Sequence, residues 1–347
     1  MKACLFHGVQ DVRLEEVPRP QVGPGDLLLK VRAAGICHSD IRVYLGQKKA
    51  RPGVIPGHET AGAVAEVGER VQGFRVGDRV VVCPILACGR CYFCRRGFRN
   101  RCPERTTLGY EEDGGLAEYM LVPARLLELG HVFKAPAGLS WEVAALTEPS
   151  ACVLNSVEAC RLDAGGSLAI VGAGPMGLLH TLMARSLGLA QVIAVEPLEE
   201  RRAYARRFGA TAAIDPQDDQ VHEAVLEATS GLGVDAAVVT TGRTEAVGLA
   251  LGLVRKQGVV NLFGGFPPDT HMDVDPNVVH YSEVSLTGSQ NATPEQYQRA
   301  LHLLTVLPQP ERLNTHRFNI NEGPEAYSSR LGMEGLKSVV VFADAGS

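Results

Sequence analysis

Three features are missing from this sequence, and each absence excludes a class of protein. There is no excess of positive charge, since 34 Lys and Arg stand against 39 Asp and Glu for a formal net charge of -5. No block of like charges stands out either, so nucleic acid is not expected as a partner. Nowhere do about 18 apolar residues run together, so we expect no membrane span and no membrane partner.

The N-terminus lacks the apolar core of a secretory signal. It reads MKACLFHGVQDVRLEE, with His7 and Asp11 where a signal needs an unbroken apolar run. The nine cysteines do not resemble a disulfide framework, because four crowd into a short stretch and the other five are scattered. These features predict a cytoplasmic protein in which the clustered cysteines bind metal.

The pattern of apolar residues changes along the chain and predicts two domains. Before residue 150, short apolar runs such as LLLKVRAAG and RVVVCPI, broken by Gly and Pro, predict an all-β lobe. From residue 167, strands alternate with helical segments, which predicts a parallel sheet of about six strands. The tail holds a helix (TPEQYQRALHLL) and a strand (KSVVVFAD) that we expect to return to the first lobe. The predicted domains are 1-150 with 290-347, and 151-289.

A glycine motif at the start of the second pattern predicts a dinucleotide site. The segment GAGPMG carries a G-x-G-x-x-G motif at the end of a predicted strand, with Pro at the first helical turn. The first glycine allows a tight turn, the second lets the backbone approach a pyrophosphate, and the third lets the helix pack on the strand. The predicted cofactor-binding residues in this motif are Gly172, Gly174, Pro175, Met176 and Gly177.

An acidic residue beyond the next strand favours NAD over NADP. Glu196 lies roughly 20 residues after the motif, where a carboxylate accepts hydrogen bonds from the ribose hydroxyls and repels a 2′-phosphate. Arg201 follows closely and is suited either to a 2′-phosphate or to the border of the adenosine. Both are predicted cofactor residues, with NADP as the less favoured cofactor.

The clustered cysteines form a C-x2-C-x2-C-x7-C motif, made by Cys88, Cys91, Cys94 and Cys102. Two-residue spacings fold a chain tightly enough to place four sulfurs about 2.3 Å from one zinc ion. An iron-sulfur cluster would use the same ligands, and disulfides are the other alternative. Because protein would fill all four positions, we expect this zinc to be structural.

Several further motifs lie in one order along the chain: GICHSD, PGHETAGAVAEVG, VGDRVVV, the cysteine loop, GGLAEYMLVP, EPSA and VGAGPMG. Together they resemble the zinc-containing medium-chain alcohol dehydrogenase family over nearly the whole chain. The branch of sorbitol and related polyol dehydrogenases is most similar, because Glu148 stands where simple alcohol dehydrogenases have a second cysteine. The resemblance implies an α/β protein with a GroES-like β-rich catalytic domain and a doubly wound Rossmann domain.

The resemblance also implies a second, catalytic zinc bound by Cys37, His58 and a carboxylate. That carboxylate is either Glu59 or Glu148, and the sequence leaves both open. Ser39 takes the position that relays the substrate proton, and Asp40 the position that orients the His58 ring. The implied reaction is hydride transfer between a small alcohol or polyol and the nicotinamide cofactor.

The chain departs from its relatives at three places. Arg42 replaces a histidine that completes the proton relay in many members, and His38 replaces an arginine that touches the pyrophosphate in many simple alcohol dehydrogenases. Gln290 and Asn291 replace a basic residue near the substrate of sorbitol dehydrogenases. Neutral amides suit hydroxyl groups, so an uncharged polyol or sugar is favoured over an acidic or phosphorylated substrate.

Other functions remain open at this stage. One rival is oxidation of an amino alcohol such as threonine, for which Arg42 is a candidate carboxylate-binding cation. A rival of another class is a zinc- and nucleotide-binding protein without catalysis. A zinc-free quinone reductase is opposed by both metal motifs. The apolar strand VSLTGS, an edge strand that pairs with its twin in this family, implies a homodimer or homotetramer.

Overall fold

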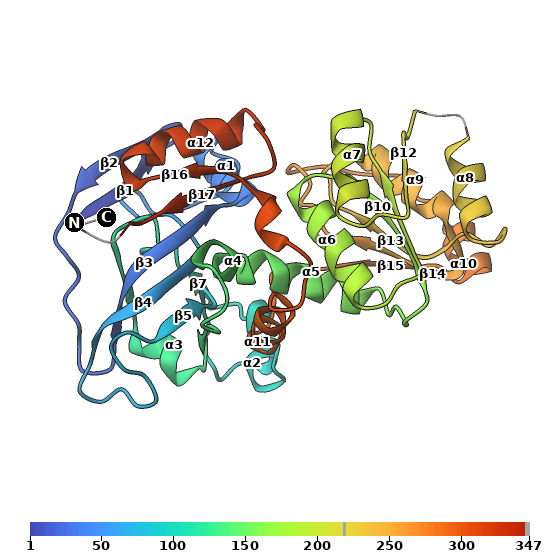
Figure 1. The fold of residues 1–347 in the computed structure, drawn as a ribbon. Coiled ribbons are helices and arrows are strands. Elements are labelled where there is room, and N and C mark those ends of the chain that lie inside the picture. The colour runs from blue at the N-terminus through green and yellow to red at the C-terminus, as the bar shows by residue number, and fades with distance from the viewer. Residues whose placement is uncertain (218–219, 344–347) are drawn as a thin grey trace. The chain divides into compact units, whose positions relative to one another are not determined.

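The computed structural model describes residues 1-217 and 220-343 of the chain, which divides into two compact units (Figure 1). The first unit comprises Met1–Ala151, Ala292–Thr305 and the described residues from Glu311 onward. The second comprises Cys152–Asn291 and Val306–Pro310. The first unit is therefore assembled from both ends of the chain.

The first unit is built on a seven-stranded sheet in the order β16-β17-β3-β4-β5-β9, with β8 also paired to β3. Two small hairpins, β1 with β2 and β6 with β7, complete its strands. The strands are β1 (Lys2–Gly8), β2 (Asp11–Glu16), β3 (Leu27–Ile36), β4 (Glu59–Val67), β5 (Arg79–Val82), β6 (Ile85–Leu86), β7 (Thr106–Thr107), β8 (Tyr119–Val122), β9 (Val132–Lys134), β16 (Asn314–Phe318) and β17 (Lys337–Val341).

The central strand β3 is buried almost throughout, because β17, β4 and β8 pair with it and side chains cover both faces. On one face Leu29 and Val31 join the largest apolar cluster of the unit, and on the other Ala33 packs in a second cluster under α4. A strand buried on both faces explains why LLLKVRAAG is almost continuously apolar instead of alternating. The pairing with β17 brings the C-terminal segment into this sheet.

The first unit also contains helices that the apolar pattern did not predict, so the expectation of an all-β lobe was incomplete. They are short, and a three- to nine-residue helix carries too few apolar repeats for its period to be recognised. These helices are α1 (His38–Tyr44), α2 (Tyr92–Arg95), η1 (Arg99–Arg101), α3 (Ala124–Glu128), α4 (Trp141–Ala145), η3 (Ile320–Glu322) and α12 (Gly323–Leu331). The helix that the sequence does predict in the tail, TPEQYQRALHLL, is α11 (Pro294–Leu303), and it belongs to the first unit as expected. Two more elements, α5 (Thr147–Ala159) and η2 (Pro310–Leu313), contain a boundary between the units.

The second unit is a six-stranded, all-parallel sheet in the order β12-β11-β10-β13-β14-β15. This is the strand order of a Rossmann sheet, and it confirms the predicted fold class. The elements are β10 (Ser167–Val171), α6 (Pro175–Ser186), β11 (Gln191–Val195), α7 (Glu199–Arg207), β12 (Ala212–Ile214), α8 (Val221–Ala228), β13 (Val234–Val239), α9 (Thr244–Leu253), β14 (Val254–Leu262), α10 (Pro276–Ser282) and β15 (Ser285–Gly288).

Helices cover both faces of the six-stranded sheet. In β10, Leu168 and Ile170 pack in one apolar cluster with Ala184 of α6, whereas Ala169 and Val171 pack in another with residues of α8 and α9. Alternate side chains of one strand therefore enter two separate cores, as a doubly wound sheet requires. Within the described residues, no helix combines the length and apolar character needed to span a membrane.

Candidate active site and cofactor site

The three glycines of the GAGPMG turn differ in their surroundings in the way that a dinucleotide site requires. Gly172 has a φ of +106°, in the region that favours glycine, and a Cβ at Gly177 would lie 2.0 Å from the Gly172 carbonyl oxygen. A Cβ at Gly174 would meet no atom within 4 Å, so this position opens onto free space. The first glycine makes the turn, the third lets α6 approach β10, and the second leaves room for a ligand.

The N-terminus of α6 lies at this open position. Gly174 is its N-cap, no side chain caps the first turn, and Pro175 is placed at the start of the helix. Met176 follows, and its carbonyl accepts a hydrogen bond from His180 Nδ1 one turn later. Free N–H groups and the positive end of the helix dipole suit a phosphate group, so the turn fits the dinucleotide.

Glu196 is held against the same turn by its own carboxylate. Oε2 accepts a hydrogen bond from Ala173 N at 2.8 Å and Oε1 from Leu198 N at 3.1 Å, and the residue is only 4% exposed. Each carboxylate oxygen has a second lone pair, which remains for a ribose hydroxyl. The structure thus fixes a negative charge beside the turn, as the sequence predicts.

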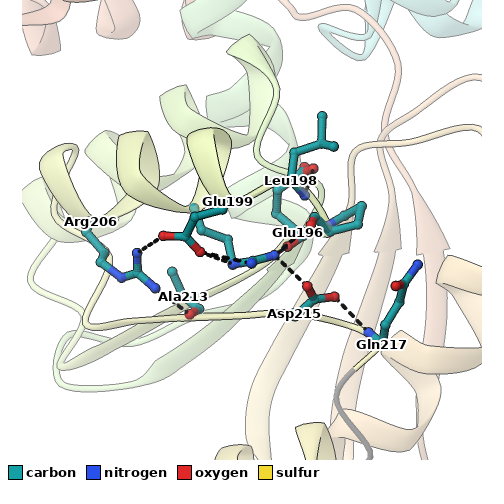
Figure 2. Close-up of polar contacts among 9 residues, drawn as sticks. Glu196, Leu198, Glu199, Arg206, Ala213, Asp215 and Gln217 are labelled. Atoms are coloured by element: carbon teal, nitrogen blue, oxygen red, sulfur yellow. Dashed lines mark hydrogen bonds and ion pairs between the residues drawn. The ribbon is translucent and has the colours of Figure 1, made fainter.

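Arg202 holds the loop that carries Glu196 in place through hydrogen bonds and ion pairs. Figure 2 shows Glu196 together with Glu199 and Asp215 in this network of polar contacts. The Arg202 guanidinium donates to the carbonyls of Glu196 and Pro197 at 2.7 Å each and pairs with Glu199 and Asp215. Arg202 is therefore fully engaged with the protein. The neighbouring Arg201, a predicted cofactor residue, is half-buried in the first turn of α7.

The four predicted structural ligands come together. Cys88, Cys91, Cys94 and Cys102 offer sulfur atoms that all lie within 4.8 Å of one another, and none is in a disulfide. Tetrahedral zinc thiolates have sulfur atoms about 3.8 Å apart, so the loop fits one zinc ion. Gly89 and Gly97, with φ of +72° and +85°, make the turns that bring the sulfurs together.

The thiols of this loop differ in their pKa values. Backbone N–H groups, first that of Arg90, lower the pKa of Cys88 to about 7. Burial raises the pKa of Cys94 to about 12. A buried thiolate is stable only beside a cation, and a divalent metal supplies that charge.

A second group of ligand atoms contains Cys37, His58 and Glu59, again all within 4.8 Å of one another. The thiol, imidazole and carboxylate are donors that zinc prefers, and the group is largely buried. Glu148, the alternative carboxylate, lies in the first turn of α5 and does not belong to this group in the structure. Its charge nevertheless contributes to raising the pKa of Tyr110 and of Cys83, so it lies near the group.

The fold explains how ligands distant in the sequence meet. Cys37 directly follows β3 and Glu59 opens β4, and in the antiparallel register Gly35 is paired with Glu59. A Cβ at Gly35 would lie 2.0 Å from Glu59 Oε2, so only glycine leaves space for this carboxylate. The β3–β4 pair therefore places the Cys37 thiol just beyond the end of β3 and the Glu59 carboxylate beside it.

Asp40 organises two of the ligands, as predicted for its orienting role. Its Oδ2 accepts from Cys37 N at 2.9 Å and its Oδ1 lies 3.2 Å from His58 Nδ1. Burial lowers the pKa of His58, but the Asp40 carboxylate outweighs burial and raises it well above the ordinary value. With Nδ1 facing Asp40, the Nε2 atom of His58 is left to bind metal.

Ser39, the predicted relay residue, has a partner that the sequence did not reveal. Its Oγ lies 2.7 Å from Tyr110 Oη and 3.5 Å from His58 Nε2. Tyr110 is 5% exposed, and its ring tilts against that of His58 at 5.2 Å between centroids. Lys48 Nζ lies over the Tyr110 ring, 3.4 Å from its centroid.

Glu59 also has a partner that sequence reasoning missed. Lys337 Nζ of β17 lies 2.5 Å from Glu59 Oε2, and both side chains are buried. Buried charges need a partner of opposite sign, and Lys337 balances Glu59 from the other end of the chain. No local motif marks Lys337, because its role depends on the pairing of β17 with β3.

The residues at which the chain departs from its relatives are placed as follows. Arg42 lies in the last turn of α1. The pKa of His38 is lowered first by burial and then by the charges of Arg330 and Arg42. Gln290 and Asn291 belong to the second unit, where the Asn291 carbonyl accepts from Asn155 Nδ2 at 2.7 Å.

Three features together define a metal-dependent dehydrogenase. They are a Rossmann sheet with a formed dinucleotide turn, a cluster of four cysteines, and a second cluster of a thiol, an imidazole and a carboxylate. Comparisons with known proteins agree. The alcohol dehydrogenase GroES-like domain model matches residues 23–132, and the zinc-binding dehydrogenase model matches residues 175–305.

The chain is 38% identical to L-threonine 3-dehydrogenase of Pyrococcus furiosus, over 95% of the chain and 94% of the relative. It is 33% identical to sorbitol dehydrogenase of Halalkalibacterium halodurans, over 99% and 100%. A zinc-binding dehydrogenase of Sinorhizobium meliloti, solved with NADP bound, superposes with a TM-score of 0.92 at 32% identity, covering 98% of this chain and 99% of that one. The chain belongs to the zinc-binding dehydrogenase family, in its polyol dehydrogenase-like branch.

Proposed function

We propose that this chain oxidises a secondary alcohol, a polyol or sugar, to its ketone, with NAD as hydride acceptor and one catalytic and one structural zinc ion per chain. The observation that carries the proposal is the convergence of Cys37, His58 and Glu59, whose ligand atoms lie within 4.8 Å. Membership of the zinc-binding dehydrogenase family supports it. A non-catalytic binding protein would have no need of these three buried donors together.

Each residue of the first unit has one task in this proposal. Cys37 and His58 hold the zinc, Glu59 is the carboxylate nearest to them, and Glu148 is a further carboxylate close by. The bound zinc supplies Lewis acidity that lowers the pKa of an alcohol hydroxyl. Ser39 relays the released proton: its Oγ takes the proton through a hydrogen bond to the substrate oxygen and gives its own hydroxyl proton to the next oxygen of the relay. Asp40 keeps the His58 ring in the required orientation.

In the second unit the glycine turn and α6 bind the pyrophosphate, and Glu196 binds the adenosine ribose. When bound there, the nicotinamide would supply the hydride-accepting ring of the reaction. NAD is our choice because the Glu196 carboxylate is fixed beside the turn and repels a 2′-phosphate. Arg201 borders the adenosine, and the NADP bound to the Sinorhizobium relative makes NADP the cofactor to test against NAD.

The second candidate substrate is an amino alcohol such as threonine. It is favoured by the similarity to L-threonine 3-dehydrogenase and by a cation near the cluster, which in this structure is Lys48. Arg42, the cation suggested by the sequence, acts instead on His38. We further propose a cytoplasmic homo-oligomer, a dimer or tetramer, which fits nine cysteines without a disulfide and a sheet that ends at β15.

The proposal is tested with purified enzyme whose metal content is measured by elemental analysis. We expect two zinc ions per chain and formation of NADH with a polyol, a sugar or threonine in a substrate panel. Removal of metal by a chelator should abolish turnover, and added zinc should restore it. Full activity after the metal is gone would disprove the proposal, as would the Cys37→Ser variant retaining wild-type turnover.

A further inference from the structure

Lys48 is a charged group beside the proposed metal site that no step of the proposed reaction uses. It follows α1 in the loop before β4. The residue as a whole is exposed, but its ammonium group lies over the buried ring of Tyr110, where surrounding protein removes part of its hydration. Tyr110 in turn touches Ser39 and His58. A continuous set of contacts therefore leads from the Lys48 ammonium to a proposed zinc ligand.

The ammonium group has unused hydrogen-bonding capacity. Among residues 1-217 and 220-343, no carboxylate lies within ion-pair distance of Lys48 Nζ, and the ammonium group lies over the face of the Tyr110 ring. A lysine has three N–H donors, and an aromatic ring satisfies at most part of this capacity. Burial lowers the pKa of Lys48, while the charges of Asp40, Cys37 and Glu111 act to raise it. An oxygen acceptor brought to Nζ would offset this loss of hydration.

We propose that the Lys48 ammonium binds a second oxygen group of the substrate, on the carbon next to the carbinol that is oxidised. Such a group is a vicinal hydroxyl in a polyol or a carboxylate in an amino alcohol, and both accept hydrogen bonds from an ammonium. Lys48 is then a specificity-determining residue. It separates substrates that carry this second oxygen from simple secondary alcohols of similar size.

This inference rests on the proposed dehydrogenase function and names the feature of the substrate that the site requires. Tyr110 contributes by holding the ammonium in place: its ring contacts both Lys48 and His58, and its hydroxyl is hydrogen-bonded to Ser39. The amides of Gln290 and Asn291 suggested hydroxyl recognition from the sequence. Lys48 adds a positive charge that those amides lack.

The experiment compares zinc-loaded wild-type enzyme with Lys48→Met, which keeps the length and removes the charge, and with Lys48→Arg, which keeps the charge. Lys49→Met, at the adjacent exposed lysine, is the matched control. Each enzyme is assayed with cyclohexanol, D-sorbitol and L-threonine. We expect Lys48→Met to raise KM for the substrates with a second oxygen by about tenfold or more, because a hydrogen bond from a charged donor is lost. For these substrates kcat should change by less than about twofold. For cyclohexanol, neither kcat nor KM should change by more than about twofold.

The Lys48→Arg variant should keep most of the affinity, and Lys49→Met should behave as wild type. Binding without turnover is measured by calorimetric titration of the enzyme–NADH complex with D-sorbitol or L-threonine, which should weaken by the same factor in Lys48→Met. The substrate whose binding weakens more in Lys48→Met identifies the neighbouring group that Lys48 binds. A carboxylate, as in L-threonine, should give the greater loss, because a hydrogen bond between two charged groups is about twice as strong as a neutral one.

The outcomes separate this inference from the proposed function. A wild-type enzyme that oxidises these alcohols while Lys48→Met leaves every KM unchanged, or raises all three equally, overturns the role of Lys48 alone. A wild type that prefers cyclohexanol to both other substrates overturns it as well. A wild-type enzyme with two zinc ions that oxidises no alcohol overturns the proposed function and, with it, this inference.

Discussion

At the scale of single residues, the two sites depend on side chains that each serve two partners. Asp40 accepts from the backbone of Cys37 and faces the ring of His58. Glu196 accepts from the backbone of Ala173 in the cofactor turn and from that of Leu198 in its own loop. These carboxylates are fixed before any ligand arrives. Pre-positioned groups lose little freedom on binding, so small changes in them are expected to have measurable effects.

The charge of Glu196 should set the choice of cofactor. Glu196→Gln keeps the shape and removes the charge, and we expect the ratio of kcat/KM for NAD to that for NADP to fall by about ten- to a hundredfold. Steady-state kinetics with both cofactors measure this ratio. Glu199→Gln on α7, where Glu199 pairs with Arg202 and Arg206, is the control and should leave the ratio unchanged. An unaltered ratio in Glu196→Gln would show that another group selects the cofactor.

Lys337 should be essential for tolerating the buried Glu59. Lys337→Met leaves the Glu59 carboxylate buried without its cation, and we expect a loss of about 3–5 kcal/mol in the free energy of unfolding of the first unit. Urea titration followed by circular dichroism gives this value. The double variant Lys337→Met/Glu59→Gln should recover most of the loss. If the single variant is as stable as wild type, the pair is not the balancing contact that its geometry indicates.

At the scale of elements, the cysteine loop should act independently of the second metal cluster. Cys94→Ser removes one sulfur of the four, so we expect zinc content to fall from two ions per chain to one. The midpoint of thermal unfolding should fall, since metal binding stabilises the folded loop. Elemental analysis together with calorimetry checks both effects. Retention of two ions per chain would contradict the assignment of this loop as a zinc site.

Helix α6 carries a histidine that should make the second unit sensitive to acid. His180 is fully buried, and burial lowers its pKa to about 4 from an ordinary 6.5. The unfolded chain thus binds a proton below about pH 6.5 that the folded chain does not bind until about pH 4. Stability is full above pH 6.5 and falls as the pH drops, by about 2 kcal/mol between pH 7 and pH 5. Urea titrations at both pH values measure this difference.

His180→Gln should reduce that pH dependence, because the new side chain does not titrate. His222→Gln, at an exposed histidine of the same unit, is the control and should keep the wild-type difference. Equal pH dependence in His180→Gln and wild type would assign the effect to other groups.

The sequence predicted the elements of the second unit well and the site only in part. Its strands and helices are long enough for apolar periodicity to be read, and the glycine turn has a spacing that follows from its chemistry. The candidate ligands Cys37 and His58 could be recognised from the family resemblance. Lys337, Tyr110 and Lys48 could not, because each acts through a contact made only after distant segments pair. Whether Glu59 or Glu148 lies nearest the thiol depended on the β3–β4 register, which the sequence left open.

At the scale of the whole molecule, strand β15 is one of the two edges of the parallel sheet, opposite β12, in the described part of the chain. Leu286 in its centre is 36% exposed, and an unpaired apolar edge favours pairing with a second copy. We expect wild-type enzyme to be a dimer or tetramer, and Leu286→Lys to lower the mass to a smaller species. Size-exclusion chromatography with light scattering measures both. Val76→Lys, at an exposed apolar residue of the first unit, should leave the mass unchanged.

The pairing of β17 with β3 constrains how the cell can make this protein. Synthesis proceeds from the N-terminus, so the ribosome releases all six parallel strands of the second unit before it has translated β17. The second, nucleotide-binding unit can therefore fold before β17 has been added to the first unit. Until then the first unit also lacks Lys337, which neutralises Glu59. A nascent chain cut short before Lys337 would carry a finished cofactor fold and an unfinished metal centre.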